Sequence, residues 1–162
     1  MLAWFDRNRD LVPLTAPIID LGCGNGVTCI HLASQGFSDV TGVDYSPDAI
    51  KLARKIAEKH GLQSHIEFEV CDILDDAVDA GTSPAHCRKF DVVFDKGTYD
   101  AISLDPEGAR VLREKYIHNV SRMLNDESLL AITSCNWTKE EILRHFSKRK
   151  NEPQSRNVAL VH

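Results

Sequence analysis

Residues 18–26, Ile-Ile-Asp-Leu-Gly-Cys-Gly-Asn-Gly, decide the fold that this sequence predicts. A short apolar run ends in an acid and three alternate glycines, and residues 27–33 then read as a helix. Glycine lets the main chain adopt positive φ and approach a ligand closely. A helix N-terminus adds free N–H groups and a partial positive charge. The order strand, glycine turn, helix therefore predicts a cradle for a nucleotide-like ligand.

The spacing of the glycines narrows the class of ligand. A dinucleotide-binding turn has the pattern G-x-G-x-x-G. Here Gly22, Gly24 and Gly26 follow the pattern G-x-G-x-G, and Asp20 lies two residues before the first of them. This spacing disfavours a dehydrogenase. A glycine-rich turn with a purely structural role stays open at this point.

An acid ends the second predicted strand, residues 39–44. Asp44 follows Gly22 by 22 residues, and an acid at about this separation accepts hydrogen bonds from ribose hydroxyls because adjacent parallel strands end side by side. The alternative, that Asp44 only caps the next helix, is weaker because Ser46 and Pro47 supply the cap and the first helical position. Ribose binding is therefore the favoured interpretation of Asp44.

A second acid follows the third predicted strand, residues 66–70. At the end of a parallel strand, Asp72 can accept a hydrogen bond from an adenine amino group while Ile73 packs on the ring. It can equally cap the turn that follows. Both interpretations of Asp72 stay open.

The segment after the fourth predicted strand, residues 90–95, is rich in polar groups. Residues 95–102 (DKGTYDAI) hold two acids, a lysine, a hydroxyl and a phenol, which is more than a plain connection needs. In a doubly wound sheet, ligands bind beyond the carboxyl ends of the strands, where the strand order reverses. We therefore expect a loop here that faces the reactive end of the ligand.

The rest of the chain continues the alternation of helices and strands. Helices are predicted for residues 1–10, 47–60 and 107–124 and after the capping box of Thr138 and Glu141, a strand for 129–134, and a helix remnant with a surface loop for 75–89. Trp137 either lines a substrate channel or is a buried aromatic plug. The alternation predicts one α/β domain over 1–162, with a doubly wound, mostly parallel sheet and helices on both faces.

Composition excludes several classes of protein. The 162 residues are 43% hydrophobic, which suffices for one core, and the net charge of −5 argues against a general nucleic-acid surface. No apolar run approaches the roughly 20 residues of a membrane span. The five cysteines are scattered without C-x-x-C spacing, so we expect no disulfide framework and no metal site. His86-Cys87, the one adjacent pair of potential ligands, is expected on a surface loop.

The motifs together resemble a known family. The turn from Asp20 to Gly26 resembles motif I of the class I S-adenosylmethionine-dependent methyltransferases, and Asp44-Tyr45-Ser46 and Asp72 agree with it. Residues 95–104 (DKGTYDAISL) and 134–138 (SCNWT) resemble the lysine methyltransferases of eukaryotic elongation factor 1-alpha. The resemblance implies a seven-stranded Rossmann-like sheet, S-adenosyl-L-methionine as methyl donor, and a lysine of the translation factor as substrate. It also implies a cytoplasmic location, with the nucleus as an alternative.

The resemblance assigns the cofactor site residue by residue. It places S-adenosylmethionine, and its product S-adenosylhomocysteine, against the predicted strand ends and the turn between them. The residues implied are Asp20, Gly22, Cys23, Gly24, Asn25, Gly26, Asp44, Tyr45, Asp72, Ile73 and Asp95.

If the chain is a lysine methyltransferase, our hypothesis places the lysine site in residues 95–100 and at Trp137. Asp95 is expected to orient the incoming amine, and Asp100 to accept its proton through water. Thr98 is expected to contact the substrate. Tyr99, also a candidate catalytic residue, and Trp137 are expected to form a channel by cation–π contact.

The sequence departs from the family pattern at both ends. The segment that precedes the first helix in the family is missing here. Of the two expected closing strands, only the run of residues 156–161 remains. We expect either residues beyond this sequence or a shortened, non-catalytic form that keeps the cofactor site. A methyltransferase acting on a small molecule or RNA is a further alternative.

Overall fold

The computed structural model of the chain describes residues 12–75, 85, 88–106, 108–147 and 157–160. The elements in chain order are β1 (Ile18–Leu21), α2 (Val27–Ser34), β2 (Val40–Asp44), α3 (Pro47–Lys59), β3 (Ile66–Val70), β4 (Phe90–Lys96), α5 (Thr98–Ser103), α6 (Ala109–Met123), β5 (Leu124–Thr133), α7 (Lys139–Ser147) and β6 (Asn157–Leu160). The helix predicted for residues 1–10, most of 75–89 and the pair His86-Cys87 lie outside the described residues.

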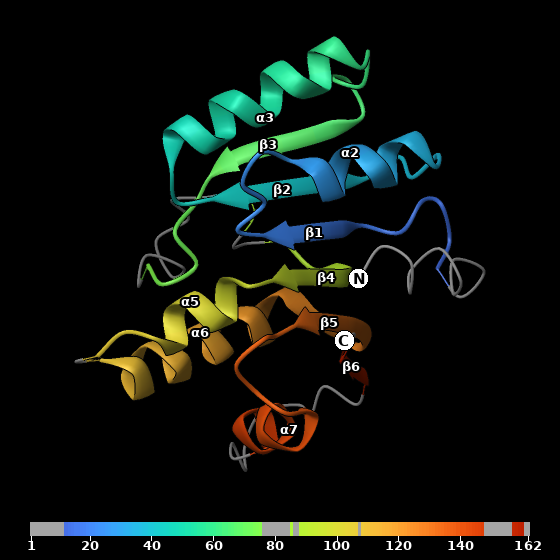
Figure 1. Ribbon diagram of the computed structural model, residues 1–162. Helices are drawn as coiled ribbons and strands as arrows, with labels where there is room; N and C mark the ends of the chain where they lie inside the picture. Colours follow the sequence, from blue (N-terminus) through green and yellow to red (C-terminus); the bar gives the residue numbers. More distant parts are fainter. Residues whose placement is uncertain (1–11, 76–84, 86–87, 107, 148–156, 161–162) are drawn as a thin grey trace.

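The strands form one sheet in the order β3-β2-β1-β4-β5-β6, and every pairing between them is parallel (Figure 1). The chain moves outward from β1 to β3 and then returns to β4 on the other side of β1. This reversal at the centre of the sheet is the doubly wound arrangement that the sequence predicts, and it opens a crevice at the carboxyl ends of β1 and β4.

The last strand agrees with the sequence prediction for the end of the sheet. β6 pairs directly with β5, with Leu129 opposite Asn157, so one closing strand follows α7, as predicted. The described residues form six strands, one fewer than the seven of the family, which agrees with the single closing strand that the sequence predicts.

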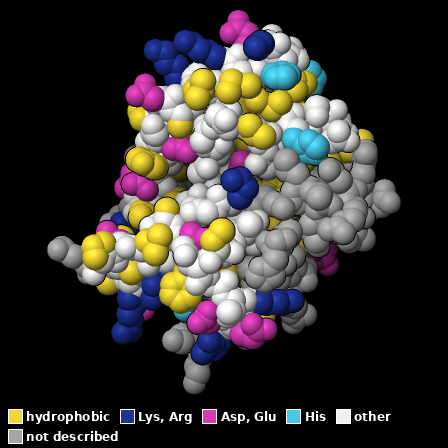
Figure 2. Space-filling model, viewed as in Figure 1, with side chains coloured by type: hydrophobic (Ala, Val, Ile, Leu, Met, Phe, Trp, Pro, Cys, Tyr) yellow, Lys and Arg dark blue, Asp and Glu magenta, His cyan; other side chains and the backbone are white. Residues whose placement is uncertain are grey.

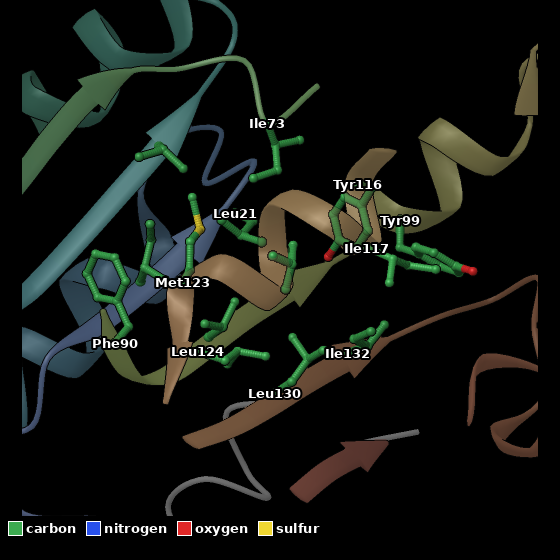
Figure 3. Packing of buried hydrophobic residues seen from close by; sticks show 14 of the residues in the cluster. Leu21, Ile73, Phe90, Tyr99, Tyr116, Ile117, Met123, Leu124, Leu130 and Ile132 are labelled. Carbon is green, nitrogen blue, oxygen red and sulfur yellow. The ribbon is translucent and has the colours of Figure 1, made fainter. Parts of the chain in front are cut away.

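Helices cover both faces of the sheet, as the alternation of side chains requires. Ile18, Val92 and Phe94 face α2 and α3 in one core cluster. Their neighbours Ile19 and Val93 point to the other face, where α6 and α7 complete a second cluster. Figure 3 shows part of this second cluster, with Tyr116 and Ile117 from α6 packed beside Leu130 and Ile132 of β5.

Local capping signals set several of the helix ends. Ser46 caps α3 by accepting a hydrogen bond from the Ala49 N–H at 3.3 Å, with Pro47 at the first helical position. Before α7, the Thr138 hydroxyl accepts from the Glu141 N–H at 3.3 Å and the Glu141 carboxylate accepts from the Thr138 N–H at 2.9 Å. Both caps confirm the sequence predictions.

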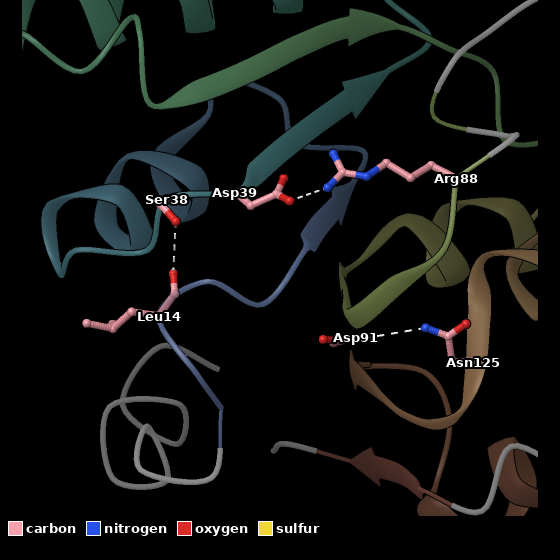
Figure 4. Close-up of polar contacts among 6 residues, drawn as sticks. All are labelled: Leu14, Ser38, Asp39, Arg88, Asp91 and Asn125. Carbon is pink, nitrogen blue, oxygen red and sulfur yellow. Dashed lines mark hydrogen bonds and ion pairs between the residues drawn. The ribbon is translucent and has the colours of Figure 1, made fainter.

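Polar contacts tie together the amino ends of the strands, away from the crevice (Figure 4). Just before β2, Asp39 forms an ion pair with Arg88, which precedes β4. The Asn125 amide donates to the Asp91 carboxylate at 3.5 Å and joins β5 to β4. At this end of the sheet, side chains of neighbouring strands bind one another. The pocket described next lies at the opposite, carboxyl ends of the strands.

Candidate functional site

A pocket of about 500 Å³ lies at the carboxyl ends of β1 to β4. Its floor comes from the ends of β2 and β3, residues 43–45 and 71–74, and its far wall from Gly22 and residues 96–98. Ala101 and Ile102 of α5 and Leu112 of α6 add apolar surface. The volume is typical of a site for a small organic ligand, and the position is the one that the strand order predicts.

The glycine turn has the backbone that only glycine adopts easily. Gly22, Gly24 and Gly26 have φ values of +66°, +55° and +77°. A Cβ on Gly22 would lie 2.1 Å from the Thr98 Oγ1, and the Thr98 hydroxyl donates to the Leu21 carbonyl at 2.8 Å. Gly22 is therefore required both by its backbone angle and by the close approach of the segment that follows β4.

Asp44 is fixed at the floor of the pocket. Its carboxylate accepts hydrogen bonds from the Gly24 N–H at 3.0 Å and from the Ser46 N–H at 2.9 Å, one on each oxygen. Each carboxylate oxygen has a further lone pair. Asp44 thus links the glycine turn to the end of β2 while keeping acceptor capacity on a pocket wall, which is the arrangement that a ribose diol requires.

The end of β3 combines an acid with apolar surface. Asp72 is exposed and its carboxylate accepts from the Leu74 N–H at 2.8 Å, so it does cap the turn. It also lines the pocket, next to the buried side chain of Ile73. Tyr45, which is 76% exposed, lines the same side. The two interpretations of Asp72 are therefore compatible.

Asp20 and Cys23 are buried beneath the glycine turn and do not line the pocket. Burial raises the pKa of Asp20 to about 7, although a hydrogen bond from Thr28 opposes the shift. Burial likewise raises the pKa of Cys23 to about 12. Asn25 is exposed but is not a lining residue either. Apart from Gly22, the residues predicted in the turn therefore support the pocket from below or lie beside it.

The structure corrects the role predicted for Asp95. Its side chain has no exposed surface, and its carboxylate accepts from the N–H groups of Thr98 and Tyr99, both at 2.9 Å. The Tyr116 hydroxyl donates to the same carboxylate at 2.5 Å. Burial raises the pKa of Asp95 to about 6 against the lowering effect of these donors. Asp95 thus holds neighbouring backbone in place and does not line the pocket that an incoming amine would enter.

The same contacts explain why residues 98–103 form helix α5 instead of the predicted loop. The first N–H groups of a helix lack partners within it, and Asp95 accepts two of them. Gly97 adopts the left-handed conformation with φ +92° that lets the chain turn from β4 into α5. Thr98, at the first position of α5, is therefore held against the pocket wall.

Asp100 and Tyr99 also differ from their predicted roles. The Asp100 carboxylate accepts from the Ser134 hydroxyl at 2.5 Å and from the Cys135 N–H at 2.7 Å, which joins α5 to the end of β5. Tyr99 has no exposed surface and its hydroxyl lies 2.6 Å from the His145 Nδ1. Figure 3 shows the hydroxyls of Tyr99 and Tyr116 pointing in opposite directions, away from each other. Neither Asp100 nor Tyr99 lines the pocket.

Trp137 is part of this packing and not of an open channel. Its ring is half-buried and meets the rings of Tyr99 and His145 edge-on, at centroid distances of 6.5 and 4.9 Å. The Arg113 guanidinium lies 5.1 Å from its centroid. This cation–π contact is made with an arginine of the protein itself and differs from the predicted contact with a substrate lysine.

Tyr116, which donates a hydrogen bond to Asp95, is the supporting residue of the site that sequence reasoning missed. It counted only as an apolar residue of the predicted helix 107–124. A signal was available, because a buried tyrosine hydroxyl needs a partner and Tyr116 is fully buried. What the sequence could not show is that Asp95 is that partner.

A second groove of about 600 Å³ runs between α3 and the edge strand β3. Lys51, Arg54 and Lys55 line it together with Phe68 and Val70. Figure 2 shows Lys and Arg side chains gathered over α3, at the top of the view. The basic groove lies apart from the pocket at the strand ends, whose carboxylates come from Asp44, Asp72 and Asp105.

Residues 15–159 match the family model described as "Methyltransferase domain". The chain belongs to this family. Among the solved structures similar to this methyltransferase domain is a SAM-dependent methyltransferase from Methanosarcina mazei, with a TM-score of 0.63 and 26% identity over 81% of this chain and 58% of the other. Another is PKMT2 from Rickettsia typhi in complex with AdoHcy, with a TM-score of 0.57 and 25% identity over 72% of this chain and 20% of the other.

Curated relatives point to a narrower group. The domain is 43% identical to human EEF1A lysine methyltransferase 2 over 148 residues, 91% of this chain and 58% of the relative. It is 36% identical to the Schizosaccharomyces pombe protein-lysine N-methyltransferase efm4 over 140 residues, 81% of this chain and 56% of the relative. The chain thus spans somewhat more than half the length of the curated relatives it matches.

Proposed function

We propose that this methyltransferase domain transfers a methyl group from S-adenosylmethionine to a lysine side chain of translation elongation factor 1-alpha. The pocket across the ends of β1 to β4, with Asp44 fixed at its floor, carries the proposal. The human relative, an EEF1A lysine methyltransferase, supports this substrate, and the fission-yeast relative, a protein-lysine N-methyltransferase, supports a lysine as the methyl acceptor.

The residues present fit an adenosyl cofactor. Asp72 offers an acceptor and Ile73 an apolar surface for adenine, and Asp44 offers acceptors for the ribose diol. The close packing of Gly22 against Thr98 keeps the turn free of side chains at the wall of the pocket. When bound, S-adenosylmethionine supplies an electrophilic methyl group on a positively charged sulfur.

The substrate amine sets a requirement that the site has to meet. With an ordinary pKa near 10.4, only about one lysine in a few thousand is neutral at pH 7. Desolvation lowers the pKa of an ammonium group and so favours the neutral amine. The apolar surface of Ala101, Ile102 and Leu112 supplies a partly dry wall beside Thr98. We expect most of the rate enhancement to come from positioning the amine there.

The cytoplasm, where elongation factor acts, is the proposed location. Cys23, Cys29, Cys71 and Cys135 are all free thiols, which fits a reducing compartment. No helix in the described part of the chain is long and apolar enough to cross a membrane.

A methyl-transfer assay tests the proposal. Labelled S-adenosylmethionine is incubated with the domain and with purified elongation factor 1-alpha, a pool of small amines or total RNA. We expect label in the protein only, on a lysine located by mass spectrometry. Label in RNA or in a small amine instead would contradict the substrate, and cofactor binding without transfer to any of the three would favour a non-catalytic form.

A further inference from the structure

The pocket contains one positive charge that its predicted cofactor contacts leave unused. Lys96, the last residue of β4, is exposed and lines the pocket beside Gly97 and Thr98. Of the described residues that line the pocket, it alone is cationic. Lys96 forms no ion pair with any residue that the structure describes.

The acids of the pocket are held by other groups. Asp44 and Asp72 accept backbone N–H groups, and the Asp105 carboxylate accepts the Gly108 N–H at 2.7 Å. These hydrogen bonds come from backbone groups, and among the residues that the structure describes no acid forms an ion pair with Lys96. A partner from the ligand is therefore the natural complement to its charge.

The order of the strands shows which part of a ligand meets Lys96. Adenine and ribose contacts are expected at the ends of β3 and β2, and Lys96 lies at the end of β4, on the other side of β1. Three strand spacings of about 4.8 Å separate β3 from β4, roughly 14 Å in all. An extended adenosyl ligand that starts at Asp72 thus brings its amino-acid end toward Lys96.

The positive charge of Lys96 determines which group at the amino-acid end of the ligand it can bind. The amino-acid end of S-adenosylmethionine carries an ammonium and a carboxylate, and the sulfur beside it is a cation. Lys96 repels both cations and attracts only the carboxylate. The charge of Lys96 also lowers the pKa of Asp20 beneath the glycine turn, although burial has the larger, opposite effect. The Lys96 ammonium therefore acts on the side of the pocket next to that turn.

We propose that Lys96 binds the carboxylate of the cofactor's amino-acid end and makes the pocket select adenosyl ligands that carry it. The inference rests on the proposed function, because it assumes the adenosyl cofactor in this pocket. It adds a specificity-determining residue at the end opposite Asp72.

Three ligands separate the carboxylate from the rest of the molecule. S-adenosylhomocysteine has the complete amino-acid end, its decarboxylated analogue lacks only the carboxylate, and 5′-methylthioadenosine lacks the whole end. Their dissociation constants are measured by calorimetry for the wild-type chain, for Lys96→Met and for Lys96→Arg. Lys51→Met, which removes an equally exposed lysine from α3, is the matched control.

We expect Lys96→Met to weaken S-adenosylhomocysteine binding about tenfold, the effect of losing one charge-assisted hydrogen bond. The two truncated ligands should bind Lys96→Met with affinities within about twofold of those for the wild type. Lys96→Arg should restore most of the loss, and Lys51→Met should bind as wild type. Increasing salt should weaken S-adenosylhomocysteine binding in the wild type more than in Lys96→Met.

Two results would overturn the assignment of Lys96. Equal affinity of wild type and Lys96→Met for S-adenosylhomocysteine would show that no such pairing exists. An equal loss for all three ligands would show that the substitution disturbs the pocket as a whole. If the wild type binds none of the three ligands, the proposed function itself fails, and that outcome is distinct from the other two.

Discussion

Acidic residues at the strand ends behave in two different ways. Asp44 and Asp72, after β2 and β3, lie on the wall of the pocket. Asp95 and Asp100, in and after β4, do not line the pocket, and their carboxylates join α5 to α6 and to the end of β5. All four are aspartates near the carboxyl ends of parallel strands. The residue type and its position on a strand are therefore insufficient to identify a ligand contact.

The difference lies in the donors that surround each acid. Asp95 receives two helix N–H groups and the Tyr116 hydroxyl, and both its oxygens are enclosed. Asp44 receives one N–H group on each oxygen and remains on an open wall. We propose that the acids outside the pocket lining position its wall, whereas the acids that line the pocket contact the ligand. The following substitutions test this division.

The largest effect is expected from Asp95→Ala. The change removes the common acceptor of Thr98, Tyr99 and Tyr116 and leaves buried donors unpaired, so the free energy of unfolding should fall by about 3 kcal/mol or more. Urea unfolding measures it. Tyr116→Phe, which removes one of the three donors, should cost about 1–2 kcal/mol. Asp95→Ala with wild-type stability would show that the acid is not a structural anchor.

The pH dependence of stability should reveal the buried acid beneath the glycine turn. Burial raises the pKa of Asp20 from 3.8 to about 7 in the folded chain, so the folded state holds a proton that the unfolded state releases near pH 4. Its contribution to stability is full below pH 4 and is lost as the pH rises toward 7, at most about 4 kcal/mol for a shift of this size.

Asp20→Asn isolates this contribution, because asparagine does not titrate. The difference in free energy of unfolding between wild type and variant is followed from pH 4.5 to 8 by urea titration. Wild type should lose stability relative to Asp20→Asn as the pH rises. A difference that does not change with pH would mean that Asp20 ionises in the folded chain as it does in the unfolded one.

Asp44→Ala should act on binding more than on folding. Removing the acceptor of the ribose hydroxyls should weaken S-adenosylhomocysteine binding by roughly 1.5–3 kcal/mol, which is about a 10- to 100-fold rise in the dissociation constant. Calorimetry measures the affinity, and thermal unfolding checks the fold. Asp48→Ala, which removes an exposed acid of α3 outside the pocket lining, controls for the loss of charge. Unchanged affinity in Asp44→Ala would remove the ribose assignment.

The smallest effect is expected from Asp72→Ala, since this acid is exposed and solvent competes for it. Loss of one hydrogen bond to the adenine amino group should cost about 1 kcal/mol of binding. The inosine analogue of S-adenosylhomocysteine lacks that amino group and should bind the variant and the wild type equally. If Asp72→Ala weakens the binding of both ligands equally, Asp72 only caps the turn and does not bind the adenine amino group.

The sequence predicts most of the fold because its signals are local. Hydrophobic periodicity placed the strands, and capping residues such as Ser46 and Thr138 placed the starts of α3 and α7. The exception is α5, which was expected to be a loop. It is a helix because Asp95 accepts its first N–H groups, and no periodicity is visible over six residues.

The candidate site was predicted only in part, because topology can be read from the sequence but the packing of distant side chains cannot. Gly22, Asp44, Asp72, Ile73 and Thr98 line the pocket as expected because the topology alone brings the ends of adjacent strands together. Tyr99 was expected to be accessible, whereas Trp137 was expected either in a channel or as a buried plug. Their burial depends on α6 and α7, which supply Tyr116, Arg113 and His145 from distant parts of the chain. Side-chain packing of this kind has no signature in the local sequence.

A crystal structure grown in excess S-adenosylhomocysteine tests the central claim most directly. We expect the ligand to lie across the ends of β1 to β4, with adenine beside Asp72 and Ile73, the ribose on Asp44 and the sulfur toward Thr98. A pocket without ligand at saturating concentration, or a ligand bound in the groove between α3 and β3, would contradict the assignment of the cofactor site.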